Sequence, residues 1–102
     1  MQQKYGIDSL SSIHEELVNL GSGGTLTYII FYKIVFVSAS IYHHINLSNA
    51  IPKTLCPKIE SRFVVTDYLG NPATVRINQN GDIETINFND SHHAGSTCFI
   101  IN

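Results

Sequence analysis

Histidine is the residue type in this 102-residue chain that most invites a chemical role. The five histidines are His14, the pair His43 and His44, and the pair His92 and His93. Adjacent residues of a strand point to opposite faces, so the first pair is poorly placed to bind one ion. The second pair could share an ion with Asp90 in a loop, but a closed zinc site needs a full tetrahedral set of ligands. We therefore expect no bound metal and no cofactor.

No arrangement of residues indicates catalysis. Cys98 and several serines are available as nucleophiles, yet no nucleophile elbow or comparable local signature surrounds any of them. The carboxylates are scattered, and none of them forms a pair suited to glycoside cleavage. The glycine run at 21–24 precedes an expected strand rather than a helix, unlike a phosphate-binding loop. We predict that the chain is not an enzyme.

Two polar loops are better suited to binding. Residues 68–71 and 89–93 combine phenol, amide, carboxylate and imidazole groups, all of which can hydrogen-bond to sugar hydroxyls. Binding residues commonly lie on loops that a rigid scaffold holds in place, although solvated turns have a similar composition. The candidate ligand-binding residues are Tyr68, Asn71, Asp90, His92 and His93.

The composition predicts one mainly β domain. Hydrophobic residues make up 43% of the chain and charged residues 14%, and 14 Ile, 6 Val and 7 Thr favour a pleated structure. The net charge of −2 argues against nucleic-acid binding, which requires a clustered basic patch. Residues 1–6 lack the apolar core of a secretory signal peptide. The most apolar stretch, 26–42, contains Lys33 at its centre and is better explained by two strands than by membrane insertion. The cysteines, Cys56 and Cys98, are expected to be buried free thiols, and a disulfide between them is the alternative.

The first twenty residues show helical spacing. Leu10, Ile13, Leu17 and Leu20 follow one another at intervals of three, four and three residues, which is the a and d pattern of a coiled coil. The pattern predicts a short helix within 1–20, followed by a flexible Gly/Ser linker at 21–24. This apolar stripe either packs on the protein's own β core or forms a bundle with other copies of the chain.

From residue 25 the hydrophobic pattern alternates, which indicates strands. In the strand at 34–42, Val35, Val37, Ala39 and Ile41 share one face, and Ser38 and Ser40 mark the other face as the solvent side. We expect strands at 25–32, 34–42, 62–67, 73–78, 83–88 and 97–101, the last of them central in its sheet. These elements predict an antiparallel β-sandwich or jelly-roll-like domain over 25–102. A three-residue loop with Gly81 in the left-handed region would pair Ile77 with Ile83, and a bulge is expected near Glu84 and Thr85.

Several phrases of the chain resemble a known family. They are Phe-Val-Val-Thr-Asp at 63–67, Gly-Asn-Pro-Ala-Thr-Val-Arg-Ile-Asn at 70–78 and Asn-Gly-Asp-Ile at 80–83. Two earlier phrases fit the same pattern: Ile-Val-Phe-Val-Ser-Ala-Ser-Ile at 34–41 and the proline-punctuated connection at 51–58. Together they resemble the C-terminal head domain of receptor-binding proteins from lactococcal siphophages, over residues 24–102. The match includes no invariant catalytic signature.

This resemblance implies a trimeric, non-catalytic β-sandwich head that binds saccharides of the host cell wall. The stripe from Leu10 to Leu20 would then be a truncated trimerising stem, much shorter than the shaft of the family. We expect a protein of the virion tail tip, made in the host cytoplasm, whose partners are a cell-wall saccharide and other tail proteins. The alternative is an accessory protein for tail structure or assembly without a receptor role. The saccharide-contacting loops of the family do not align by motif, so no binding residue is transferred.

Overall fold

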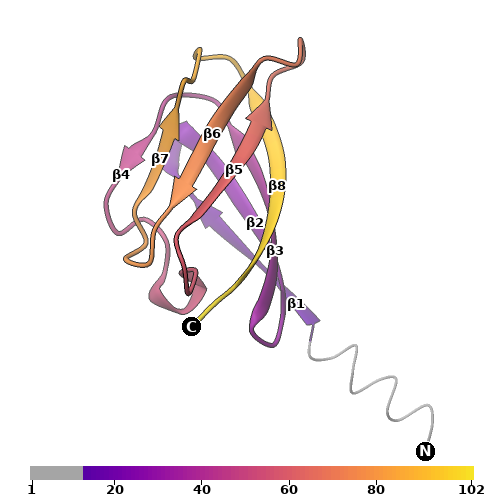
Figure 1. Ribbon diagram of the computed structural model, residues 1–102, viewed down its shortest axis with the longest axis vertical. Helices are drawn as coiled ribbons and strands as arrows, with labels where there is room; N and C mark the ends of the chain where they lie inside the picture. Colours follow the sequence, from indigo (N-terminus) through magenta and orange to yellow (C-terminus); the bar gives the residue numbers. More distant parts are fainter. Residues whose placement is uncertain (1–12) are drawn as a thin grey trace, which may run out of the picture.

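The computed structural model describes residues 13–102 (Figure 1). This part of the chain consists of strands, turns and two short 3-10 helices. The elements in chain order are β1 (Ile13–Asn19), η1 (Gly21–Gly23), β2 (Gly24–Phe31), β3 (Ile34–Ile41), β4 (Asn46–Leu47), η2 (Lys53–Leu55), β5 (Ser61–Thr66), β6 (Pro72–Ile77), β7 (Ile83–Ile86) and β8 (His93–Ile100). Each 3-10 helix has three residues, so no helix within 13–102 is long enough to cross a bilayer.

The strands form one antiparallel sheet in the order β1-β2-β3-β8-β5-β6-β7-β4. Strand β8 pairs with β3 along its whole length, but its pairing with β5 is confined to Ala94 and Thr66. The sheet curls beyond this junction, so β5, β6 and β7 lie in front of β1, β2 and β3 (Figure 1). The mainly β, antiparallel fold and the central position of the last strand are confirmed.

The core fills the space inside the curl. Every second side chain of each long strand points inward, as expected for the two-residue period of a strand. In β3 the inward residues are Val35, Val37, Ala39 and Ile41, which confirms the predicted face. Other fully buried core side chains come from both halves of the sheet and include Leu26, Tyr28, Val65, Val75, Ile77 and Ile83.

The predicted N-terminal helix is wrong for the part of 1–20 that the structure describes. Residues Ile13–Asn19 form strand β1, paired along its length with β2. Val18 and Leu20 are buried, whereas Ile13 and Leu17 lie on the outer side and are 43% and 65% exposed. The leucine spacing fitted a helix, but pairing with β2 and the burial of Val18 and Leu20 override that weak local preference. Leu10 lies outside the described residues.

The predicted linker at 21–24 is also a structured element. Gly21–Gly23 forms η1, and the backbone N–H of Leu20 donates to the carbonyl of Gly24 at 2.9 Å, closing the β1–β2 hairpin. Gly24 has φ 134, and a Cβ atom at this position would overlap the carbonyl oxygen of Ser40. This glycine is therefore required for close packing of β2 on β3 rather than for flexibility.

The β6–β7 hairpin forms as predicted. Ile77 pairs with Ile83, Gly81 has φ 89, and the loop is closed by a hydrogen bond from Asn78 N–H to the carbonyl of Asp82 at 3.1 Å.

The expected bulge near Glu84 is absent, because pairing between β6 and β7 runs without interruption. In this regular register Thr85 points inward, and Ile86 points outward and is only partly buried. Thr85 is tolerated in the interior because its hydroxyl accepts a hydrogen bond from the backbone N–H of Ile45 at 2.9 Å.

Both cysteines are free, as predicted, but only one of them is buried. Cys56 lies in the core, whereas Cys98 is on the outer side of β8 and exposed to solvent. The prediction that Cys98 is buried is wrong, because the alternation along β8 directs this side chain away from the core.

Candidate ligand-binding loops

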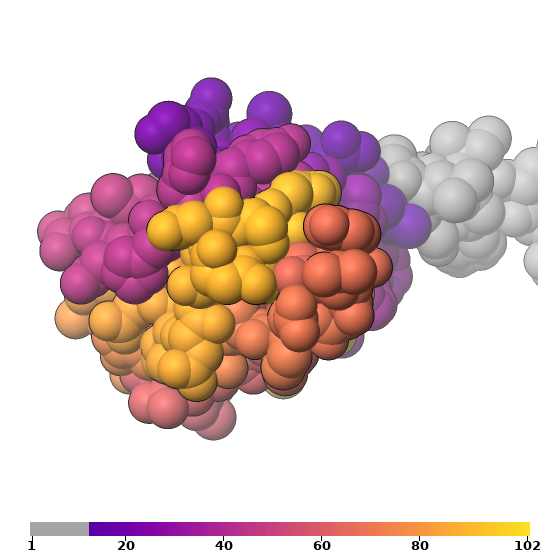
Figure 2. Space-filling view, turned by 90° about the horizontal axis from the view of Figure 1, so that it is seen from above, coloured from indigo at the N-terminus to yellow at the C-terminus, as the bar shows by residue number. Residues whose placement is uncertain are grey.

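Three connections meet at one end of the molecule. They are the β3–β4 connection with the last two residues of β3, the β5–β6 turn and the β7–β8 connection, which we call the loop end (residues 40–44, 67–71 and 89–92). Figure 2 looks onto this end and shows the amber β7–β8 connection beside the red-orange β5–β6 turn, with the magenta β3–β4 connection adjoining it. The antiparallel order of the strands brings these distant segments of the sequence together.

The buried carboxylate of Asp67 joins two of these connections. It accepts hydrogen bonds from the backbone N–H groups of Leu69 at 3.0 Å and Asn71 at 2.8 Å, and from the Asn71 side chain at 3.0 Å. From the β7–β8 connection it accepts the side-chain amide of Asn89 at 3.1 Å and the hydroxyl of Ser91 at 3.4 Å. The carboxylate thus fixes the shape of the β5–β6 turn and attaches it to its neighbour.

The hydrogen bonds to Asp67 also determine its ionisation. Burial alone would raise the pKa of this carboxyl, but the donors from Asn71, Asn89 and Leu69 outweigh burial and hold the pKa well below its usual range. Asp67 is therefore ionised at any physiological pH. Its lone pairs are occupied by the protein, so its role is to position the loops rather than to contact a ligand.

An exposed aromatic pair lies on the same end. The ring of His92 stacks on Tyr42 with centroids 4.8 Å apart and an interplanar angle of 22°. The Nε2 atom of His92 is 2.8 Å from the hydroxyl of Ser40, which holds the imidazole in place. Tyr42 is 48% exposed, so the pair presents a flat surface edged with polar groups to the solvent.

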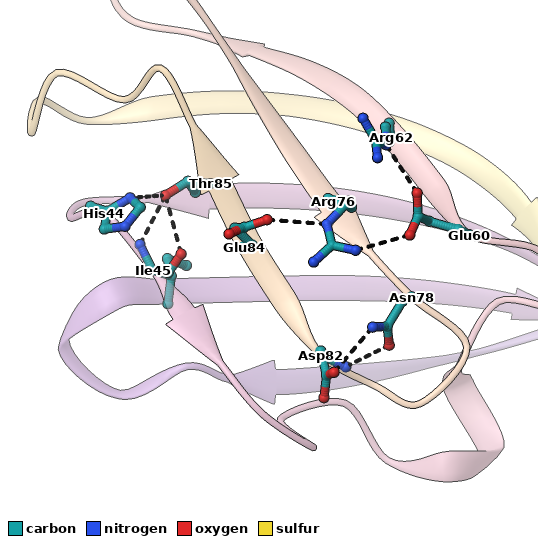
Figure 3. Close-up of polar contacts among 9 residues, drawn as sticks. All are labelled: His44, Ile45, Glu60, Arg62, Arg76, Asn78, Asp82, Glu84 and Thr85. Atoms are coloured by element: carbon teal, nitrogen blue, oxygen red, sulfur yellow. Dashed lines mark hydrogen bonds and ion pairs between the residues drawn. The ribbon is translucent and has the colours of Figure 1, made fainter.

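The β3–β4 connection is tied to the rest of the loop end through His44. Its Nδ1 atom is 2.8 Å from the hydroxyl of Thr85 (Figure 3), and its backbone N–H donates to the carboxylate of Asp90 at 3.2 Å. Asp90 has φ 62, a left-handed conformation that turns the β7–β8 connection toward His44. All three connections are thus held by side-chain hydrogen bonds, which makes the loop end preorganised.

The loop end carries little charge. No Lys or Arg occurs in residues 40–44, 67–71 or 89–92. Its exposed polar groups are two tyrosines, three histidines, amides, hydroxyls and the single carboxylate of Asp90, and Leu69 is its one exposed aliphatic side chain. This combination suits a neutral, hydroxyl-rich ligand better than a polyanion.

Four of the five predicted binding residues lie at the loop end, but they differ in availability. Tyr68 is 88% exposed, and Asp90 and His92 are also at the surface. Asn71 is exposed, but its side-chain nitrogen already donates a hydrogen bond to the carboxylate of Asp67. His93 does not reach the surface and lies in the interior.

The position of His93 follows from strand β8, which begins at this residue instead of near Thr97 as predicted. Opposite Ile41, its side chain points inward and is 1% exposed, with Nδ1 2.7 Å from the carbonyl of Ser91 and the ring against Phe88. We therefore remove His93 from the candidate site.

The sequence prediction missed Tyr42, Ser40 and His44. These residues were assigned to the end of the second strand and the segment after it, so their side chains were not considered as part of a site. The available signal was the run Tyr-His-His at 42–44, which begins where the alternation of buried and exposed residues in β3 ends. Binding residues are disproportionately found on loops that a rigid scaffold positions, so a run of aromatic and imidazole side chains just after a strand could have been included in the site.

A second polar cluster lies on the outer side of β5, β6 and β7 (Figure 3). Arg76 pairs with Glu84 at 3.1 Å and with Glu60 at 2.9 Å, and Glu60 also pairs with Arg62 at 3.0 Å. Arg62 and Arg76 are direct cross-strand neighbours, so Glu60 offsets the repulsion between them. Hydrogen bonds from both arginines lower the pKa of Glu60. The cluster is self-neutralised and serves to hold the sheet together.

Within residues 13–102, no three His, Cys, Asp or Glu side chains are grouped so that they could hold a metal ion. No protein-family profile matches the chain, and no curated protein matches it either.

Proposed function

We propose that this protein is a tail-tip protein of a bacteriophage virion, made in the host cytoplasm, that binds a neutral saccharide of the host cell wall through its loop end. The proposal combines the resemblance of residues 24–102 to receptor-binding head domains with the geometry of the loop end. It assigns no catalytic role to the chain.

The observation that supports the proposal best is the preorganised aromatic surface. The Tyr42–His92 pair and the exposed ring of Tyr68 lie on connections held together by Asp67, Ser40 and Thr85. Aromatic rings pack on the apolar faces of sugar rings, and neighbouring amides and hydroxyls hydrogen-bond to their hydroxyls. A fixed surface loses little conformational entropy on binding.

Assembly into a homotrimer, which the resemblance implies, would strengthen such a site. A shallow surface binds one saccharide weakly, but several copies on one cell wall raise the overall affinity without any new contact. We include the trimer in the proposal for this reason.

Co-sedimentation with purified cell walls of Gram-positive bacteria, lactococci among them, tests the proposal. The native chain should bind the walls of its host saturably, and Tyr42→Ala or Tyr68→Ala should each weaken binding by about five- to tenfold. Tyr32→Ala is the matched control, because Tyr32 is 67% exposed in the β2–β3 turn, at the opposite end of β2 and β3. Failure of the native chain to bind any wall, or an equal effect of Tyr32→Ala, would overturn the proposal.

The alternative is an accessory protein for tail structure or assembly. It is favoured by one observation, an apolar surface on β1, β2, β3 and β8 suited to contact with protein. Binding to isolated tail components in the absence of any binding to cell walls would support this alternative.

A further inference from the structure

The sheet is interrupted between β8 and β5. Within residues 13–102 the two strands pair only at Ala94 and Thr66, near the loop end, and then separate toward the other end of the molecule (Figure 1). Beyond the gap, Ile101 forms a single bridge with Pro57. Between these two contacts the chain has eight residues on the β5 side, 58–65, but only six on the β8 side, 95–100. The longer side bows away from β8, and a groove of about 610 Å³ lies between them.

The main chain of β8 faces this groove at every second residue. The carbonyl of Ile100 accepts a hydrogen bond from the N–H of Lys58 at 2.8 Å, on the side of β8 away from β3. The next N–H, of Ile101, donates at 2.8 Å to the carbonyl of Lys33, on the β3 side. Because β8 pairs with β3 without interruption, the N–H and C=O groups of Cys98 share the direction of Ile100 and point into the groove. No strand within residues 13–102 pairs with them there.

The inner side of β8 is incompletely covered beside the groove. The inward residues of β3 are all buried, whereas Thr97 and Phe99, which point inward from β8, are only partly buried and line the groove. The ring of Phe99 packs edge-to-face on the core residue Tyr28, with centroids 6.3 Å apart. The outer rim of the groove is also apolar, since Ile59 and Ile100 are exposed there. A segment lying in the groove would therefore gain apolar contacts on its inward side.

Lys58 provides the uncompensated charge of the groove. The other charged lining residues, Glu60 and Arg62, pair with each other at 3.0 Å, and Glu60 also pairs with Arg76 at 2.9 Å. Lys58 is exposed, and no carboxylate within residues 13–102 lies at ion-pair distance from its ammonium group. A ligand with a carboxylate beside Lys58 would complement this charge.

The two outer edges of the sheet are protected, unlike the edge of β8 in the groove. β1 carries His14, Glu15 and Glu16 in succession, and β4, at the other end of the strand order, has only two residues. Charged side chains and very short edge strands discourage pairing with another chain. Residues 94–100 of β8 include no charged side chain. The edge of β8 beside the groove thus lacks these protective features.

From these features we infer that the groove binds an extended peptide segment of another protein, which adds to the sheet as a strand beside β8. The backbone of the segment pairs with the N–H and C=O groups of Cys98, its inward apolar side chains contact Phe99, and an acidic side chain lies beside Lys58. Main-chain hydrogen bonds of this kind provide affinity, and alternate side chains provide specificity. The groove is at the opposite end of β8 from the loop end, so this inference and the proposed saccharide binding can fail independently.

Amide hydrogen exchange, measured by NMR on the ¹⁵N-labelled chain, tests strand addition. The probe is a capped synthetic peptide of alternating valine and threonine that ends in glutamate. The amide of Cys98 should exchange rapidly in the chain alone, and saturating peptide should slow this exchange by about tenfold or more, because the N–H gains an acceptor. The amide of Ile101 already donates to Lys33, so its exchange should change much less. The same peptide with every backbone N–H methylated should give no protection, because it has no donors and cannot approach closely.

Charge reversal tests the position of the acidic side chain. Lys58→Glu should weaken binding of the glutamate peptide by about five- to tenfold and should favour the same peptide ending in lysine. Lys53→Glu makes the same change of charge at an exposed position of η2 outside the groove, and it should leave the affinities for both peptides unchanged. Circular dichroism verifies that both variants keep their β structure.

Three results would overturn the inference. The first is a Cys98 amide that is already protected in the chain alone, because the groove would then be filled by the protein itself or by another copy of it. The second is the absence of protection at about 1 mM of the glutamate peptide. The third is equal binding of the methylated peptide, which would exclude main-chain pairing. Binding that Lys58→Glu leaves unchanged would contradict the placement of the acidic side chain.

Discussion

At the scale of single residues, Asp67 is the side chain on which the candidate site depends most. It contributes to the loop end without facing a ligand, because its oxygens are occupied by donors from the β5–β6 turn and the β7–β8 connection. The turn signal at 69–72 could be read from the sequence, but the partners of Asp67 could not. Asn89 and Ser91 lie more than twenty residues further along the chain, and only the fold brings them together.

Stability in acid should report the ionisation of Asp67. Its pKa in the folded state lies below the unfolded value of about 3.9, so the stabilisation is complete above that value and is lost as the pH falls below it. Urea unfolding of the native chain should show a decline of the free energy of unfolding between about pH 5 and about pH 2. Asp67→Asn should be less stable at neutral pH and show a shallower decline; an unchanged slope would contradict the assigned role.

The two thiols should differ sharply in reactivity. Burial raises the pKa of the Cys56 thiol, and this side chain is enclosed by the core, whereas Cys98 is exposed on β8. At low protein concentration a maleimide or a disulfide reagent should modify one thiol per folded chain, and Cys98→Ser should abolish this fast reaction. Fast modification of two thiols, or of Cys56 in the Cys98→Ser variant, would show that the packing around Cys56 is misassigned.

At the scale of elements, β1 and its connection to β2 show where sequence patterns mislead. The spacing from Leu10 to Leu20 satisfied a helical repeat, and the run Gly-Ser-Gly-Gly had the composition of a linker. Both features are explained instead by the pairing of β2 with β1 on one side and with β3 on the other. Val18 and Leu20 pack on the core at the end of β1, and Gly24 allows β2 to approach β3. The β6–β7 hairpin was predictable because turn chemistry and cross-strand pairs favoured the same register.

Alanine substitutions within this one connection separate close packing from flexibility. Gly24→Ala would push a methyl group into the carbonyl of Ser40, whereas Gly21 has open space around it and a positive φ of 70. Gly24→Ala should therefore lower the melting temperature much more than Gly21→Ala, which carries only the strain of its backbone conformation. Thermal unfolding followed by circular dichroism measures both. Equal, small shifts would indicate that 21–24 is a flexible linker after all.

At the scale of the whole molecule, the fold class followed from composition and alternation. The 14 isoleucines, 6 valines and 7 threonines made a β protein the natural prediction, and the alternating inward residues of β3 were identified correctly. The curl of the sheet could not be predicted from the sequence, because it depends on long-range packing. It accompanies the restriction of β5–β8 pairing to Thr66 and Ala94. The pairing that extends β8 to His93 is also long-range, so His93 was predicted to lie in a loop although it begins this central strand.

The core formed by this curl should behave as one cooperative unit. Ile77 is fully buried between the two halves of the sheet, so Ile77→Ala should lower the free energy of unfolding by about 2–5 kcal/mol. Ile59→Ala removes the same atoms from a side chain that is 77% exposed. This variant should change the free energy of unfolding by less than about 0.5 kcal/mol. Denaturant unfolding measures both, and comparable effects of the two variants would contradict the described core.

The proposed binding of a cell-wall saccharide at the loop end can be tested by mapping the bound surface of the protein. Backbone amide resonances of the ¹⁵N-labelled chain are recorded by NMR while soluble saccharide released from host cell walls is added. We predict saturable shifts concentrated in residues 40–44, 67–71 and 89–92, with the β2–β3 turn and the β6–β7 loop unaffected. Shifts confined to another surface, or no shifts at saturating saccharide, would contradict it.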